Sequence, residues 1–166
     1  MNQEEYLEKL LSSYQSYFDI ERDVNLENRT LAATAFFHSR SEKYVLSKKA
    51  QLWATEMNEY VYFAFADVLT ADDFLTLKED VLQAGLQKIK PHKEHMYSYV
   101  SLVVVTDLVS EDAKKAIKKA KFHKTYQFSL HGWMYLRIAV VELSNHSIYA
   151  NKQGEDMTKL LQEALS

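Results

Sequence analysis

The sequence predicts an α+β domain in which helices pack on a mixed β-sheet, with an N-terminal antiparallel meander followed by one βαβ unit. Apolar residues make up 47% of the 166 residues and aromatic residues 13%, which is enough material for one core. Some segments repeat apolar residues at helical spacing, and others alternate or run continuously as strands do. With only three Gly and one Pro, linkers are not expected, so residues 1–166 are predicted to form a single domain.

The N-terminal half is predicted to hold a helix and the meander. Asn2 and Glu5 stand in capping-box positions before apolar residues at helical spacing, so a helix is expected over 3–18. The polar stretch 21–28 is expected to connect this helix to the sheet. The strands of the meander are expected at 31–38, 43–46, 52–55 and 60–66, with a turn at 57–59. The last of these runs is apolar on both faces, which predicts a central position in the sheet.

The C-terminal half alternates helices and strands. Thr70 followed by Asp73 predicts the start of a helix over 71–88, and Ser110 predicts the start of a third helix. A closing helix is expected over 157–165. The remaining strands are expected at 97–106, 126–128 and 133–143, with a hairpin turn and short return strand at 143–149. Strand, helix and strand in this order predict a right-handed crossover.

The predicted order α-β-β-β-α-β, followed by α-β-β-α, is similar to the core order of the restriction-endonuclease-like fold. Enzymes of that fold hold magnesium with one acidic residue and an acidic-x-Lys triplet on the next strand. Here the strand reads Glu59-Tyr60-Val61, which places Val where the triplet needs Lys. An endonuclease-like domain of this sequence would therefore be degenerate at its metal site.

Residue usage and charge exclude several classes of function. The sequence has no cysteine, which excludes disulfides, thiolate nucleophiles and iron–sulfur clusters. It has no phosphate loop, dinucleotide-binding glycine motif or His-Glu-x-x-His motif, so no cofactor and no metal are predicted. The first five residues are acidic where a signal peptide is basic, and no apolar run approaches the roughly 20 residues of a membrane span. A cytoplasmic protein without membrane contact is expected.

The net charge of −3 provides no general attraction to nucleic acid. One basic stretch, from Lys114 to Lys124, could attract a phosphate backbone, but it carries few interleaved aromatic residues. The lysines therefore fit the solvated face of a helix better than a nucleic-acid site. A protein partner or a second copy of the chain is the remaining macromolecular expectation.

Two polar clusters are candidates for chemistry. One is the segment 91–95, which holds two histidines beside a carboxylate, and the other is 38–43, which mixes both charges with hydroxyls. Each cluster also fits an ordinary polar loop or turn. If the two segments meet, an anionic substrate could be held by cationic side chains with histidine as acid or base. The candidate site residues are His38, Arg40, Lys43, His92, Glu94 and His95.

Arg137 interrupts an otherwise apolar strand, so it is expected either to point to a wet face or to pair with a carboxylate such as Glu142 or Glu59, and a structural pair is favoured.

Three stretches resemble an uncharacterised family of small proteins from clostridium-like bacteria. They are His38-Ser39-Arg40-Ser41-Glu42-Lys43-Tyr44, Asn58-Glu59-Tyr60 and Lys90-Pro91-His92-Lys93-Glu94-His95-Met96-Tyr97. The resemblance implies a bacterial, cytoplasmic setting and transfers no catalytic residue. With a complete core and no recognisable reaction centre, the sequence favours a non-catalytic binding or interaction module. The alternative is an enzyme that acts on a phosphate-bearing or otherwise anionic substrate.

Overall fold

The computed structural model describes residues 1–44, 52–92, 95–128 and 130–166. Its described part contains four α-helices, one 3-10 helix and a seven-stranded mixed sheet. The helices are α1 (Gln3–Tyr14), α2 (Ala71–Lys88), α3 (Glu111–Lys119), η1 (Gln153–Met157) and α4 (Thr158–Leu165). The strands are β1 (Asp19–Asn25), β2 (Thr30–Tyr44), β3 (Leu52–Leu69), β4 (His95–Val109), β5 (His123–Thr125), β6 (Trp133–Glu142) and β7 (Ser147–Ala150).

The sheet has the strand order β1-β2-β3-β4-β6-β5, and β7 also pairs with β6. The predicted N-terminal antiparallel meander is confirmed, but it consists of β1, β2 and β3, and β1 lies where a connection was expected. Both β3–β4 and β4–β6 are parallel pairs, while β5 and β7 run antiparallel to β6. The predicted α+β class with a mixed sheet is confirmed, and the sheet holds a second parallel pair in addition to the expected one.

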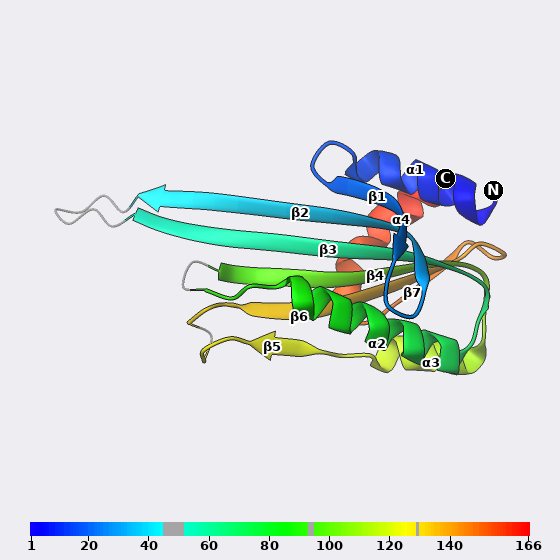
Figure 1. The fold of residues 1–166 in the computed structure, drawn as a ribbon. Helices are drawn as coiled ribbons and strands as arrows, with labels where there is room; N and C mark the ends of the chain where they lie inside the picture. Colours follow the sequence, from blue (N-terminus) through cyan, green and yellow to red (C-terminus); the bar gives the residue numbers. More distant parts are fainter. Residues whose placement is uncertain (45–51, 93–94, 129) are drawn as a thin grey trace.

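Helices cover both faces of the sheet (Figure 1). The crossovers β3-α2-β4 and β4-α3-β6 advance in the same direction across the sheet, so a common right hand places their helices on the same face. Accordingly α2 and α3 contribute to one buried layer, which includes Phe74, Ile117 and Leu102. The helices α1 and α4 build the opposite layer, with Tyr6 and Leu161 packed against Phe63.

Three helix starts follow the capping signals in the sequence. The Asn2 side chain accepts a hydrogen bond from the Glu5 amide at 2.9 Å, and the Glu5 carboxylate accepts one from the Asn2 amide, which is a capping box. Thr70 and Ser110 cap α2 and α3 in the same manner through one side-chain oxygen each. The predicted span of α2, residues 71–88, is confirmed.

Several predicted boundaries are wrong. The expected turn at 57–59 does not form, because these residues pair with β2 on one side and with β4 on the other, and β3 is continuous. The polar stretch 21–28 contains most of β1, an edge strand. The expected strand 126–128 is replaced by β5, since Gln127 and Phe128 have positive φ angles of 50° and 52°. The restriction-endonuclease-like order is not confirmed, since the strands before α2 are not those on which it was based.

Two buried contacts fix elements in the sheet. Gly85 lets α2 approach β4 closely, because a Cβ at this position would lie 2.5 Å from the Cγ atoms of Val100. At the end of β6 the buried carboxylate of Glu142 accepts hydrogen bonds from the Val109 amide and the Tyr149 hydroxyl, both at 2.9 Å. Burial alone would raise the pKa of Glu142, but these two hydrogen bonds, the Asn145 side chain and the charge of Lys114 together hold the pKa below its usual value.

Candidate ligand-binding site

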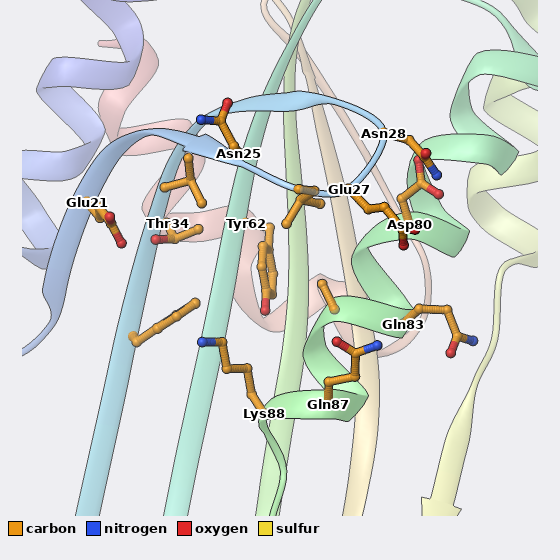
Figure 2. Close-up of a pocket in the computed structure, with 14 residues that line it drawn as sticks. Glu21, Asn25, Glu27, Asn28, Thr34, Tyr62, Asp80, Gln83, Gln87 and Lys88 are labelled. Atoms are coloured by element: carbon orange, nitrogen blue, oxygen red, sulfur yellow. The ribbon is translucent and has the colours of Figure 1, made fainter.

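A pocket, the hairpin pocket, opens between the β1–β2 hairpin, the sheet and α2 (Figure 2). Its volume is about 630 Å³, which is within the range of small-molecule sites. The sheet provides its floor with Thr34, Phe36 and Tyr62. The hairpin lines it with Glu21, Val24, Asn25, Leu26, Glu27 and Asn28, and α2 lines it with Asp80, Gln83, Ala84, Gln87 and Lys88.

The hairpin is held against α2 by an ion pair. The Nε of Arg29 donates to Oδ2 of Asp80 at 2.8 Å, and both side chains are mostly buried, with 28% and 22% exposed. The hairpin turn itself is closed by the Leu26 amide, which donates to the Arg29 carbonyl oxygen at 2.8 Å. Leu26 also packs on the core layer beneath α2. These contacts hold the hairpin against α2 and the core beside the pocket.

Tyr62 on the pocket floor carries a polar atom that lacks a partner. Its residue exposure is 1%, and within the described residues its hydroxyl is the one buried side-chain polar atom without a hydrogen bond. Burial raises the pKa of Tyr62, and the nearby Tyr60 adds to the rise. The phenol therefore stays protonated near neutral pH and can both donate and accept a hydrogen bond.

The two ends of the hairpin pocket carry side chains of opposite charge. Glu21 and Glu27 stand on the hairpin side and form no ion pair with any described residue. Lys88 lies at the last turn of α2, and its Nζ is 5.6 Å from the centre of the Phe36 ring. Figure 2 shows Lys88 beside the hydroxyl end of Tyr62, with Glu27 and Asp80 at the opposite end. The pocket thus has an acidic end and a basic end.

The structure brings two of the sequence-predicted residues onto one face of the sheet. His38 donates from Nδ1 to the amide oxygen of Asn58, and the Asn58 amide reaches Ser98 Oγ at 3.4 Å. His92 donates from Nε2 to a Glu56 carboxylate oxygen at 2.8 Å. Since Glu56 and Asn58 are two residues apart on β3, their side chains lie on the same face. One residue of each polar cluster thus bonds to a side chain on this face of β3.

The other predicted residues cannot be joined to this arrangement. Arg40 and Lys43 belong to β2 and His95 to β4, but their side chains lie outside the described residues, as does all of Glu94. No group of three or more His, Asp or Glu side chains within the described ranges is arranged to hold a metal ion. The six-residue site thus stays a prediction.

Comparison with protein-family models assigns the chain to a family. The family model of a domain of unknown function (DUF8052) matches residues 2–163. The chain belongs to this DUF8052 family. The resemblance to an uncharacterised family is confirmed, while the clostridial source stays a prediction. Comparisons with curated proteins and with solved structures gave no match.

The expected partner of Arg137 is confirmed in this DUF8052 member. The guanidinium donates to the Glu59 carboxylate and to Ser101 Oγ, and it lies 4.3 Å from the centre of the Tyr99 ring. Burial raises the pKa of Glu59, and the charge of Arg137 opposes this rise. These contacts satisfy the arginine on the face opposite the hairpin pocket, which gives it a structural role.

The basic stretch from Lys114 to Lys124 is the only segment in which the sequence allowed nucleic-acid binding. Lys114, in the basic stretch, donates to Glu111 at 2.7 Å and lies 5.2 Å from the centre of the Tyr149 ring. These contacts occupy one of the lysines that a nucleic-acid site would need.

None of the helices in the described segments is long and apolar enough to cross a membrane.

Sequence reasoning missed the hairpin pocket. Its residues come from 21–36, from Tyr62 and from 80–88, and no local pattern connects these segments. The available signal was the polar stretch 21–28, which carries two glutamates and two asparagines beside an apolar sheet. The same polar stretch also fits a solvated connection between two elements. Only the position of β1 in the structure shows that it forms a pocket wall.

Proposed function

We propose that the protein is a non-catalytic binding module that holds a small polar ligand in the hairpin pocket. The observation that carries this proposal is the buried hydroxyl of Tyr62, which has no hydrogen-bond partner among the described residues. A buried polar group without a hydrogen bond costs about 1–3 kcal/mol, and such groups are rare in native proteins. A ligand that bonds to this hydroxyl would recover that free energy on binding.

The chemistry of the lining supports binding rather than catalysis. The phenol of Tyr62 is kept protonated by burial, so it is a poor base near neutral pH. Asp80 is held by Arg29 and is not available to a substrate as a free carboxylate. The remaining wall is rich in the amides of Asn25, Gln83 and Gln87, which recognise ligands by hydrogen bonds. A cytoplasmic setting belongs to the proposal and is supported by the lack of cysteine.

A fragment screen by NMR tests the proposal. Mixtures of amino acids, short peptides, polyols and sugars would be added to ¹⁵N-labelled protein, and perturbed amide signals would be mapped on the structure. A ligand of the hairpin pocket should perturb amides in 21–28 and 80–88, and its effect should weaken strongly in Tyr62→Phe. Tyr6→Phe is the matched control, because Tyr6 is buried in the opposite layer. Hits that map elsewhere, or that ignore Tyr62→Phe, would contradict the proposal.

A second candidate is an enzyme acting on a phosphate-bearing or otherwise anionic substrate. The bonds of His38 and His92 to Asn58 and Glu56, on one face of β3, favour it, because two imidazoles near one substrate could exchange protons with it. Hydrolysis of a chromogenic phosphate monoester and of a phosphodiester would be measured for the wild type, His38→Gln and His92→Gln. Activity that falls at least tenfold in both variants would support the enzyme. Equal activity in all three proteins would exclude these histidines.

A further inference from the structure

We propose that the ligand of the hairpin pocket is a small zwitterion of the amino-acid or short-peptide class. Its ammonium group would lie beside Glu27, at the end of the pocket where Asp80 also lies, and its carboxylate beside Lys88 and the Tyr62 hydroxyl. This inference rests on the proposed function and adds the chemical class of the ligand.

The acidic end favours a cationic group. Glu27 has no ion-pair partner among the described residues, and Asp80 at the same end shares its charge with Arg29. Glu21 is also without an ion pair among the described residues, but it lies level with Thr34 and Tyr62, away from this end. The lining therefore has more negative than positive charge around the hairpin. The side-chain oxygen atoms of Asn25 and Asn28 lie on the same wall and can accept further N–H bonds. An ammonium group has three donors and no acceptor, so it matches this set of oxygen atoms.

The basic end favours an anionic group. Lys88 forms no ion pair with a described residue, and its ammonium group lies over the Phe36 ring. The protonated hydroxyl of Tyr62 beside it can donate a hydrogen bond, and that bond has no present recipient. A carboxylate has two oxygen atoms and can accept from both groups at once. Charge-assisted hydrogen bonds of this kind are stronger than bonds between neutral groups.

The separation of the two ends sets the length of the ligand. Asp80, at the acidic end, and Lys88, at the basic end, are eight positions apart on α2, which corresponds to about 12 Å along the helix axis. An extended peptide spans at most about 3.5 Å per residue, so two or three residues plus an ionic contact at each end cover this distance. A free α-amino acid, whose two charges are adjacent, can satisfy only one end. The geometry thus favours a short peptide over a single amino acid.

Trialanine is the probe, with alanine as the comparison for length. Binding to the full chain would be followed by amide chemical shifts near neutral pH and at low salt. N-acetyl-trialanine removes the ammonium charge, and trialanine amide removes the carboxylate charge. Since an exposed ion pair contributes up to about 1 kcal/mol, each capped peptide should bind about three- to fivefold more weakly than trialanine. Alanine should bind more weakly than all three.

Variants assign each charge of the peptide to its end of the pocket. In Lys88→Met the amide cap should no longer weaken binding, while the acetyl cap still should; Glu27→Gln should show the reverse. Lys90→Met and Glu163→Gln are matched controls outside the pocket lining, and both should keep the wild-type preferences.

The outcomes separate the inference from the proposed function. Capped and free peptides that bind equally, or trialanine that does not bind, would overturn the zwitterion. A neutral polyol that binds through Tyr62 in place of trialanine would also overturn it, but would leave the pocket as a binding site. Trialanine that perturbs 21–28 and 80–88 equally in the wild type and in Tyr62→Phe would refute the role given to the hydroxyl in both proposals.

Discussion

Removing the hydroxyl of Tyr62 should make the ligand-free protein more stable. The ring of Tyr62 is buried in the layer under α2, and phenylalanine keeps these ring contacts. The hydroxyl has no hydrogen bond to any residue that the structure describes, so its burial costs about 1–3 kcal/mol that Tyr62→Phe would recover. We expect the free energy of unfolding to rise by about 1–2 kcal/mol. For a chain of this size, that corresponds to a rise in Tm of roughly 2–8 °C.

Tyr6→Phe provides the matched comparison, because the chemical change is the same and the surroundings differ. Tyr6 is fully buried, and its hydroxyl donates to the Leu161 carbonyl oxygen at 2.9 Å. Loss of this bond should lower the free energy of unfolding by about 0.5–1.5 kcal/mol. Urea unfolding of both variants, followed by circular dichroism, measures the two changes. If Tyr62→Phe loses stability as Tyr6→Phe does, the Tyr62 hydroxyl has a partner in solution and the reasoning is refuted.

Three further predictions test packing and charge in the fold. Gly154→Ala should lower the free energy of unfolding, measured by urea titration, by about 3 kcal/mol or more. The new Cβ would lie 2.0 Å from the Ile138 carbonyl oxygen, so the backbone must move. Near-wild-type stability would contradict this close approach. Gly85→Ala should cost about 1–3 kcal/mol, and less in a Val100→Ala background, since the clash is with the Val100 side chain; additive losses would contradict a direct contact. The pKa of Glu142 is lowered on folding, so its stabilising contribution is complete above its unfolded value near 4.5 and is lost as pH falls through the lower folded value. Unfolding measured from neutral pH down to pH 3 should therefore show a shallower acid loss in Glu142→Gln, whereas parallel curves would exclude this role.

Elements with strong local signals were predictable from the sequence. The helix over 71–88 has a capping threonine at one end and an apolar stripe that includes Phe74 and Leu77, and both features are determined by nearby residues. The strand β4 carries a β-branched run at 103–106 and was found for the same reason. Arg137 was expected to pair with a carboxylate because an isolated buried charge is costly, and Glu59 provides that pair.

Elements that depend on distant partners were not predictable. The strand β1 consists largely of Asp, Glu, Arg and Asn, and it forms because β2 provides hydrogen bonds along one edge. Met57, Asn58 and Glu59 have the composition of a turn, yet strands on both sides keep them extended. The same limit applies to the candidate sites. The sequence identified His38 and His92 as candidate site residues. The surroundings of the Tyr62 hydroxyl could not be predicted, because they are formed by α2 and the hairpin, which are distant from Tyr62 in the chain.

The measurement that tests the hairpin pocket most directly is the NMR signal of Tyr62 itself. In protein labelled with ¹³C at the tyrosine ζ carbon, the Tyr62 resonance is assigned by its loss in Tyr62→Phe, and the Tyr6 resonance is an internal control in the opposite layer. Trialanine should shift the Tyr62 resonance in a saturable manner and leave the Tyr6 resonance in place, because only the Tyr62 hydroxyl gains a hydrogen bond. A Tyr62 resonance that stays unchanged with trialanine and with every hit of the fragment screen would contradict a ligand site built on this residue.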